Sequence, residues 1–581
     1  MKHKSLLVHL LLIVGLLWPN NIIARNELEN PTTVGDNNSY DYIVVGVGAA
    51  GAILARKLSD RNESVLALDL GEFRYDDPII LSPNIGAVIE GVPVITSLSF
   101  DPRYAKIYPI PIGGTDALTY SEGQGSIGGG AAHNFLAAVR GTPSIYDAWA
   151  AASGDPRWIY NNLLPKMKAL EHFYPNVATP PDPSQRGFTG PISITQAPPF
   201  TSLYLTTTLP AASNSITSLD YNNPNQGITV VSTPQSLVTP GPNSRRSYSA
   251  LEFLPMTGPG AVIDAEGNGL NGRRLKVQAS ARVIKINFDD RHKAVSVDYI
   301  LTKDNCTEIR TAYLNNTGKL VLSAGAIQTP NLLLHSGVGP QHELSTLGIP
   351  VVLNSPNVGK NFQTHFGASA LIAGNTGTGF AFIDGNGPSV SPPFLLPEGV
   401  RRLQIISQGF GAVSSSLAFL LNPFTRGSVN LVSADPLIDP EIVFPLYDPA
   451  TGQDQFATPG TDANLIVRYL KIILDAATDA GLVVLQPSPA VYAGGDAALF
   501  AYARDLTNAV IAIHGAGTAR MGTDISNSVV DGRLKVHGLR NVYIGDASVQ
   551  PLLPDGNTNL SVYYTALELA AILGYDTPPA L

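Results

Sequence analysis

Residues 40–60 read YDYIVVGVGAAGAILARKLSD, and residues 63–72 continue as ESVLALDLGE. The apolar run 42–45 predicts a short strand, residues 49–58 have the composition of a buried helix, and the apolar run 65–68 predicts a second strand. A glycine-rich turn, rather than a polar loop, joins the first strand to the helix. This order of elements predicts an α/β fold with a nucleotide-binding unit near its N-terminus.

Three glycines and one carboxylate make this prediction specific. Gly46 permits the tight turn, Gly48 lets the backbone approach a pyrophosphate, and Gly51 lets the helix pack close to the strand. The N-terminus of that helix then faces the phosphates. Asp69 ends the second strand, where it can accept hydrogen bonds from the hydroxyls of an adenosine ribose. The spacing predicts a dinucleotide site but does not separate NAD from FAD.

The length, the net charge and the cysteine count exclude some classes of protein. The chain has 581 residues, of which 44% are hydrophobic and 14% charged, and its formal net charge is -9. A chain of this length has enough apolar material for two structural lobes. Because no basic face is offered to phosphates, the composition argues against a nucleic-acid partner. Cys306 is the only cysteine, so the chain cannot form an intramolecular disulfide bond.

The N-terminal residues differ from the rest of the chain. Lys2 and Lys4 precede an almost continuous apolar run, Leu6 to Trp18. That run is too short to cross a bilayer of roughly 30 Å as a helix, and its proportions are those of a signal peptide. We therefore expect residues 1–24 to be a signal peptide, the protein to be secreted or extracytoplasmic, and no stable membrane span to be present.

Five further segments, spread over the chain, are similar to one family. They read GQGSIGGGAAHNFLAAVRG (123–141), LVLSAGAIQTPNLLLHSGVGP (320–340), LGIPVVLNSPNVGKNFQTH (347–365), HGAGTARMG (514–522) and VVDGRLKVHGLRNVYIGDASVQPLLPDGNTN (529–559). In this order they resemble the motifs of the glucose-methanol-choline (GMC) oxidoreductases. The resemblance implies FAD as the cofactor and the CH–OH group of an alcohol as the electron donor.

The resemblance also implies how the chain is divided. We expect a Rossmann-type FAD-binding lobe from the discontinuous segments 36–200, 245–345 and 515–581. Segments 201–244 and 346–514 are expected to form a second, α+β substrate lobe built on an antiparallel sheet.

Two local patterns in the second lobe agree with this division. Apolar alternation over residues 366–440, interrupted by Gly, Ser and Pro, predicts strands of an antiparallel sheet. Apolar residues at helical spacing over 462–481 predict a packing helix that ends at a glycine.

The predicted cofactor contacts come from the dinucleotide turn and from the resemblance. In addition to Gly46, Gly48, Gly51 and Asp69, the resemblance assigns contacts with FAD to Gly128, Gly129, His133, Asn134, Val283, Asp546 and Ala547. Choline oxidases carry a histidine at the position of His133 that bonds covalently to the flavin, so covalent FAD through His133 is one expectation. The alternative is a histidine that only packs against the flavin ring.

Alcohol oxidation removes a proton from oxygen and a hydride from carbon. We expect His514 to accept the proton, because a neutral base must lie close to the hydroxyl, and flavin N5 to accept the hydride. Asn557 matches the second catalytic position of the family, where its amide can support the developing alkoxide; Asn559 is the nearby alternative. His335, His365 and His537 are expected to be structural, although the segment of His365 can lie near the mouth of the site.

The expected partners are a small-molecule alcohol and either oxygen or another electron acceptor, and no metal site is predicted. The sequence leaves two alternative functions open. The first is a hydroxynitrile lyase on the same flavoprotein scaffold, although such lyases favour histidine at the position of Asn557. The second is a secreted structural homologue without turnover, which the intact His514, Asn557 and glycine loops oppose.

Overall fold

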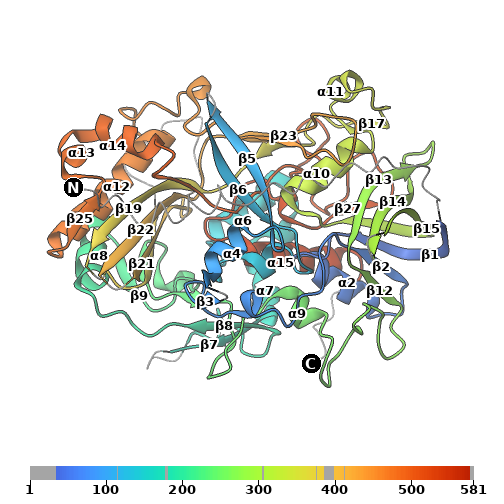
Figure 1. The fold of residues 1–581 in the computed structure, drawn as a ribbon, viewed down its shortest axis with the longest axis horizontal. Helices are drawn as coiled ribbons and strands as arrows, with labels where there is room; N and C mark the ends of the chain where they lie inside the picture. Colours follow the sequence, from blue (N-terminus) through green and yellow to red (C-terminus); the bar gives the residue numbers. More distant parts are fainter. Residues whose placement is uncertain are drawn as a thin grey trace.

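Two β-sheets organise the chain (Figure 1). The computed structural model describes residues 34–89, 91–113, 116–176, 181–303, 306–374, 376–384, 398–410 and 412–575. The predicted signal peptide, residues 1–24, lies outside the described residues. Within them, helices and strands alternate as in a mixed α/β fold, which confirms the predicted class.

The first sheet has seven strands in the order β12-β2-β1-β15-β14-β13, with β27 also paired to β15. These strands are β1 (Val34–Val45), β2 (Val65–Leu68), β12 (Leu275–Gln278), β13 (Ala281–Phe288), β14 (Ala294–Lys303), β15 (Cys306–Leu322) and β27 (Val542–Ile544). Strands β12, β2, β1, β15 and β27 are mutually parallel, so their carboxyl ends meet at one edge. The strand predicted at 42–45 is the last part of the longer β1.

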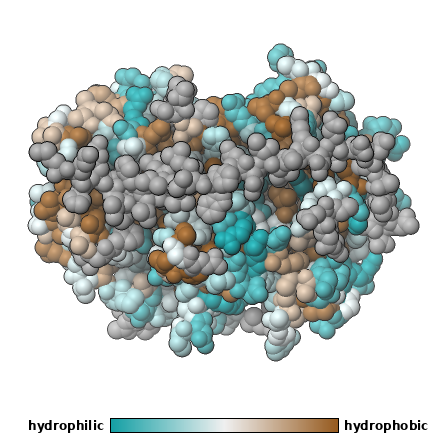
Figure 2. Space-filling view, viewed as in Figure 1, coloured by the Kyte–Doolittle hydropathy of each residue, from teal (hydrophilic) through white to brown (hydrophobic). Residues whose placement is uncertain are grey.

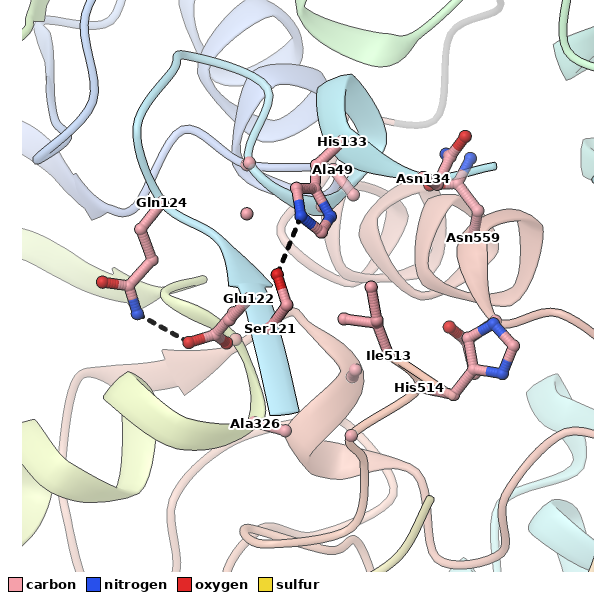
Figure 3. Close-up of a pocket in the computed structure, with 18 of the residues that line it drawn as sticks. Ala49, Ser121, Glu122, Gln124, His133, Asn134, Ala326, Ile513, His514 and Asn559 are labelled. Atoms are coloured by element: carbon pink, nitrogen blue, oxygen red, sulfur yellow. Dashed lines mark hydrogen bonds between the residues drawn. The ribbon is translucent and has the colours of Figure 1, made fainter. Parts of the chain in front are cut away.

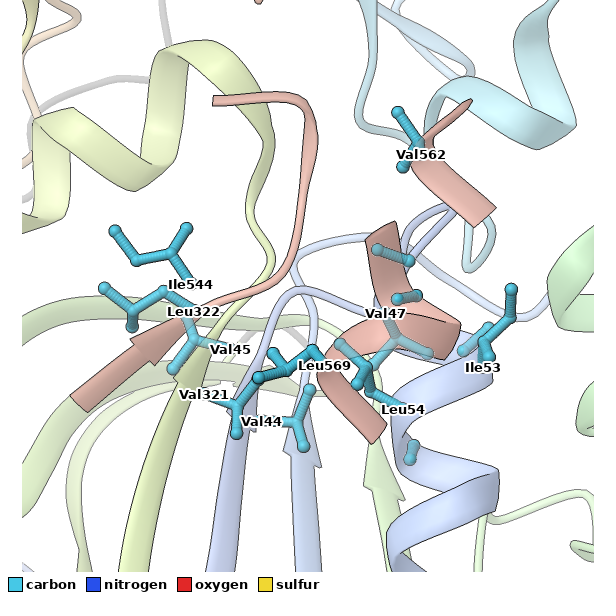
Figure 4. Close-up of a cluster of buried hydrophobic side chains, with 14 of the residues drawn as sticks. Val44, Val45, Val47, Ile53, Leu54, Val321, Leu322, Ile544, Val562 and Leu569 are labelled. Carbon is cyan, nitrogen blue, oxygen red and sulfur yellow. The ribbon is translucent and has the colours of Figure 1, made fainter. Parts of the chain in front are cut away.

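Two helices pack against the parallel strands. Helix α2 (Gly51–Ser59) follows the glycine turn, and α15 (Asn559–Ile572) lies next to it. Figure 4 shows Leu54 of α2 and Leu569 of α15 packed beside Val44 of β1 and Val321 of β15. Because β1 and β15 are covered in this way, their side chains are apolar on both faces. The packing holds the glycine turn at the carboxyl edge of the sheet.

The second sheet has eight strands in the order β25-β19-β22-β21-β20-β10-β9, with β26 also paired to β19. They are β9 (Ile216–Ser218), β10 (Val230–Ser232), β19 (Phe366–Ala373), β20 (Gly379–Asp384), β21 (Arg401–Phe410), β22 (Val413–Leu420), β25 (Val483–Gln486) and β26 (Ala509–Ile511). The pairs from β20 to β25 are antiparallel, as the alternation over 366–440 predicts. The predicted packing helix is α12 (Asp462–Asp479), which covers one face of this sheet.

Shorter elements connect the two sheets. The hairpin of β5 (Ala105–Gly113) and β6 (Asp116–Gly123) leads into the one-turn helix α5 (Gly130–His133), and α10 (Gly325–His335) follows β15. The remaining α-helices are α3 (Pro78–Leu81), α4 (Val94–Phe100), α6 (Pro143–Ser153), α7 (Tyr160–Leu170), α8 (Leu209–Ser213), α9 (Ser249–Phe253), α11 (Gln341–Thr346), α13 (Pro489–Ala493) and α14 (Gly495–Arg504). Smaller sheets are formed by β11 (Gln235–Ser236), β8 (Ile192–Gln196) and β7 (Glu171–Tyr174), and by β18 (Lys360–Phe362), β23 (Gly427–Asn430) and β24 (Glu441–Val443). Three two-stranded sheets are β5 with β6, β3 (Val88–Ile89) with β4 (Val92–Pro93), and β16 (Val338–Gly339) with β17 (Leu353–Asn354).

The helices and the surface bear on the predicted lack of a membrane span. No helix in the described part of the chain is both long enough and apolar enough to cross a bilayer. On the face shown in Figure 2, hydrophobic residues occur in separate groups among polar ones.

Candidate functional site

One large cavity, of about 690 Å³, lies where the two sheets approach each other. Its walls come from the carboxyl ends of β1, β2 and β15, from the β6–α5 connection, and from strands β20 to β22 of the second sheet. Figure 3 shows this cavity with His133 on one side and His514 on another. The predicted site residues that line it are Gly46, Gly48, Asp69, Gly129, His133, Asn134, Val283, His514, Asp546, Ala547 and Asn557. Gly51 and Gly128 are not among the lining residues.

The glycine turn is built by close backbone contacts. Gly46 has a φ of +91°, and a Cβ on Gly51 would lie 1.8 Å from the carbonyl oxygen of Gly46. Gly51 therefore acts behind the cavity wall, by letting α2 pack against the end of β1. Gly48 and Gly129 face each other across the cavity edge, since a Cβ on Gly129 would lie 3.1 Å from the Cα of Gly48. Larger residues at these positions would fill the space between the two loops.

Asp69 is fixed at the end of β2. Its two carboxylate oxygens accept hydrogen bonds from the backbone N–H of Val47 at 2.5 Å and of Gly71 at 2.7 Å. Burial raises the pKa of Asp69 to about 6, although both hydrogen bonds act in the opposite direction. Each oxygen has a second lone pair, so the carboxylate can still accept from a ligand in the cavity.

Gly128 faces the protein and not the cavity. It has a φ of +109°, and a Cβ there would lie 2.6 Å from the ring of Tyr248. An aromatic ring from a distant segment therefore excludes a side chain at Gly128, and the contact of this residue with FAD stays a prediction. The neighbouring Gly129 keeps the expected place at the cavity.

The side chain of Asn134 lines the cavity, and its amide nitrogen is available to a ligand. Its Oδ1 accepts hydrogen bonds from the backbone N–H of Leu136 and from Nη1 of the buried Arg246, each at 2.8 Å. Its Nδ2 is buried and has no hydrogen-bond partner among the described residues. Since the oxygen is held by two donors, the amide N–H₂ is oriented by the protein and available to a ligand acceptor.

His133 is only 2% exposed and lies at the end of α5. Its Nε2 lies 3.2 Å from the hydroxyl oxygen of Ser121 on β6 (Figure 3). Burial and the charge of Arg246 lower the pKa of His133 to about 4, while a hydrogen bond to the backbone of Leu98 acts in the opposite direction. The imidazole is therefore neutral near pH 7.

Asp546 lines the cavity, and its carboxylate is hydrogen-bonded within the protein; its contact with FAD stays a prediction. Its carboxylate accepts hydrogen bonds from the backbone N–H of Gly325 at 2.9 Å, from the hydroxyl of Thr329 at 2.6 Å, and from Ser548. These contacts join β27 to the start of α10. Burial raises the pKa of Asp546. The carboxylate thus orders the loop, and Ala547 continues the cavity wall beside it.

The two predicted catalytic residues meet at the far end of the cavity. Nδ2 of Asn557 lies 3.4 Å from Nε2 of His514, and both side chains line the cavity. Nε2 of Gln404 on β21 donates to Oδ1 of Asn557 at 3.0 Å, which turns the Asn557 amide N–H₂ toward His514. Asn559, the alternative, instead begins α15.

His365 directly contacts His514, and a purely structural interpretation of it is therefore insufficient. Nδ1 of His365 lies 2.8 Å from Nδ1 of His514, and Nε2 of His365 lies 3.0 Å from the carbonyl oxygen of Pro554. This contact could not be predicted from the sequence, because the two histidines belong to separate segments. The one signal was the position of His365 at the end of a segment similar to the family.

The hydrogen bonds determine which nitrogen of His514 carries a proton. The carbonyl of Pro554 can only accept, so Nε2 of His365 is protonated. Burial, and then the proximity of His514, lowers the pKa of His365 well below its usual value. Nδ1 of the neutral His365 must accept from Nδ1–H of His514, which leaves Nε2 of His514 with a free lone pair. Burial lowers the pKa of His514 to about 4, so this lone pair is available at neutral pH.

The donor set fits FAD. Asn559, like Asn134, lines the cavity with a buried amide nitrogen that has no partner among the described residues. Two unpartnered amide donors suit the polar edge of an extended ligand, and the Gly48–Gly129 approach suits its diphosphate. Across the described ranges, no group of three or more His, Cys, Asp or Glu side chains is arranged to hold a metal ion.

Comparisons with known proteins agree with this geometry. An alcohol dehydrogenase (acceptor) of Pseudomonas putida is 28% identical over 576 residues, which cover 92% of this chain and 95% of that protein. An oxygen-dependent choline dehydrogenase of Serratia proteamaculans (strain 568) is 28% identical over 595 residues, covering 93% and 96%. The solved structure of pyridoxine 4-oxidase from Mesorbium loti has the same fold, with a TM-score of 0.73, 24% identity and coverage of 92% and 99%.

Two family sequence models, both described as GMC oxidoreductase, match residues 40–256 with 264–367 and residues 423–566. Together these matches span most of the chain and include the glycine turn, His514 and Asn557. The chain belongs to the GMC oxidoreductase family, whose members are FAD-dependent oxidoreductases acting on CH–OH donors.

Proposed function

We propose that His514 is the base and Asn557 the hydrogen-bond donor in the oxidation of a small-molecule alcohol to a carbonyl compound. The observation that carries the proposal is the chain of contacts from Pro554 through His365 to His514, which assigns an unprotonated Nε2 to His514 beside the amide of Asn557 at the cavity. A hydroxyl oxygen within hydrogen-bond distance of both nitrogens gives its proton to Nε2 of His514. The Asn557 amide donates to the same oxygen and stabilises the negative charge that develops on it.

The reaction removes one proton and one hydride from the alcohol. The O–H proton goes to His514, the carbinol C–H leaves as hydride, and the C–O single bond becomes a double bond. FAD, when bound, supplies the acceptor for that hydride. Oxygen or another acceptor then removes the two electrons.

The proposed division into lobes follows the two sheets. We assign a Rossmann-type FAD lobe to 36–200, 245–345 and 515–581, and a substrate lobe to 201–244 and 346–514. Nearly every residue of the seven-stranded sheet falls in the first set, and every strand of the eight-stranded sheet falls in the second. The catalytic residues lie at the junction, as expected for a site that joins cofactor and substrate.

Two further proposals complete this function. His133, neutral and at the cavity wall, is proposed to bond covalently to FAD. The new N–C bond would replace one C–H bond of the flavin 8α-methyl group, with loss of a proton. The two electrons would reduce the flavin, and oxygen or another acceptor would then reoxidise it. The basic start and short apolar run of residues 1–24 support secretion of the enzyme.

Anaerobic flavin reduction tests the proposed roles. An alcohol substrate should bleach the flavin absorbance, and His514→Ala should slow the bleaching by about 10²–10⁴-fold while FAD stays bound. Because the pKa of His514 is lowered to about 4, the base is already unprotonated in mildly acidic solution. The rate should therefore be constant from about pH 5 to pH 8 and fall as the pH drops through about 4.

Two results would count against this assignment. Unchanged reduction in His514→Ala would show that another group accepts the proton. Cleavage of a cyanohydrin without any alcohol-dependent bleaching would favour the hydroxynitrile lyase, which performs no net redox chemistry.

A further inference from the structure

One face of the eight-stranded sheet is directed at the catalytic pair. Gln404 of β21 donates to Asn557, so its side chain points to the cavity. Side chains alternate along a strand, which places Ile406 and Gln408 on the same face as Gln404. Both line the cavity. The part of this side that lines the cavity is called the substrate wall below.

The strand register extends the substrate wall to the neighbouring strands. Ile406 is paired with Phe380 of β20 and with Leu417 of β22, and Gln404 is paired with Phe419 of β22. Paired residues in antiparallel strands point to the same side, and all three apolar partners line the cavity. Val510 of β26, four residues before His514, joins the same side through its pair Gly367. Apart from Gln408, these strand residues of the wall are therefore aromatic or aliphatic.

The alternate residues point the other way. Leu403, Ile405 and Ala418 are fully buried in the core that the sheet forms with α12. The two faces of β21 thus have different surroundings. One stabilises the lobe, and the other borders the site beside His514.

The charged side chains that line the cavity come from elements outside the substrate wall. Among the described residues, those that line the cavity are Asp69, Lys106, Glu122, Arg282, Asp439 and Asp546. None belongs to the second sheet. Lys106 pairs with Asp439 at 2.6 Å, and Glu122 accepts from Gln124 at 2.6 Å and lies beside Gly325 after β15. The polar groups that the second sheet and its turns contribute to the wall are Thr378 and Gln408, both uncharged.

We infer that the substrate is an uncharged alcohol with an apolar aryl or alkyl group, an assignment that rests on the function proposed above. Its hydroxyl meets His514 and Asn557 while its carbon skeleton lies on the substrate wall. A quaternary ammonium group placed there would meet the rings of Phe380 and Phe419 but no carboxylate to balance its charge. A sugar would bring several hydroxyls to a wall that can satisfy few of them.

A substrate series on the holoenzyme tests this assignment. The second-order constant for anaerobic flavin reduction should rise about fourfold for each methylene from 1-butanol to 1-hexanol, as expected for burial against an apolar surface. Benzyl alcohol and 1-hexanol should exceed choline and D-glucose by roughly 100-fold. Faster reduction by choline or glucose would overturn the substrate assignment but not the proposed function. If none of these alcohols bleached the flavin, the proposed function would fall and the assignment with it.

Adjacent residues on β21 provide a matched control. Ile406→Ala removes apolar surface from the substrate wall and should reduce the preference for 1-hexanol over glucose by about tenfold. Ile405→Ala removes the same atoms from the opposite face, so it should lower the melting temperature and leave the preference unchanged. If Ile405→Ala does not fold, Ile405→Val serves the same purpose. An unchanged preference in Ile406→Ala would show that the wall does not select the substrate.

Discussion

At the scale of single residues, the proposed base, His514, is oriented by a partner 149 positions earlier in the chain. His514 alone could carry its proton on either nitrogen. His365 removes that freedom, because the Pro554 carbonyl fixes the proton of His365 and leaves only one arrangement for the pair. His365 is a positioning residue, since it acts on the substrate through His514.

Replacing His365 should impair proton removal without disturbing substrate binding. In His365→Leu the Nδ1–H of His514 loses its acceptor, so the unproductive tautomer becomes accessible; loss of such an orienting partner costs up to about 10⁴-fold in turnover. We expect flavin reduction to slow by about 10²-fold or more, with little change in the alcohol concentration at half-saturation. Rapid-mixing measurements at saturating alcohol separate these two quantities.

His365→Gln is the conservative variant for the same position. Its Oε1 can accept from His514 and its Nε2 can donate to Pro554, so it should recover much of the rate. Wild-type reduction rates in His365→Leu would show that the contact does not orient His514.

At the scale of elements, the glycine turn depends on the packing of α2 against β1. A Cβ on Gly51 would lie 1.8 Å from the backbone oxygen of Gly46. Because both groups belong to the backbone, neither can move aside as the end of a flexible side chain can. Gly51→Ala should therefore displace α2, lower the melting temperature and reduce the FAD content of the purified protein. Overpacking of this kind costs about 1–3 kcal/mol or more.

Gly260→Ala is the control for that change. Nothing lies within 4 Å of a Cβ at Gly260, so calorimetry and the ratio of flavin to protein absorbance should match the wild type. An equally stable, fully yellow Gly51→Ala protein would contradict the proposed close packing of helix and strand.

The same elements indicate what the sequence could and could not predict. The β1–α2–β2 unit and α12 were predictable because apolar periodicity and glycine positions are local signals. The pairing of β12 with β2 joins segments that no local pattern relates. For the same reason, neither the ring of Tyr248 against Gly128 nor the contact of His365 with His514 could be predicted. Local sequence defines the elements, whereas the contacts that orient the site arise only after distant segments pack.

At the scale of the whole molecule, the cavity is enclosed by segments from nearly the full length of the chain. Its lining begins at Val45 on β1 and ends at Val562 on α15, and it includes both sheets. A ligand that binds only the folded chain stabilises it by mass action. FAD is thus expected to stabilise the two lobes together, and a covalent bond at His133 would make this stabilisation independent of the free FAD concentration.

Acid denaturation followed by separation of protein from small molecules tests the covalent bond. His133 is neutral, because burial lowers its pKa to about 4, and a neutral imidazole has the lone pair that a bond to the flavin requires. Flavin fluorescence should stay with the wild-type polypeptide and separate from His133→Ala. The melting temperature of His133→Ala should then rise with added FAD, by an amount equivalent to about 2.7 kcal/mol at 100 times the dissociation constant. If all FAD leaves the denatured wild-type chain, His133 only packs against the flavin, and both proteins should show the same dependence on added FAD.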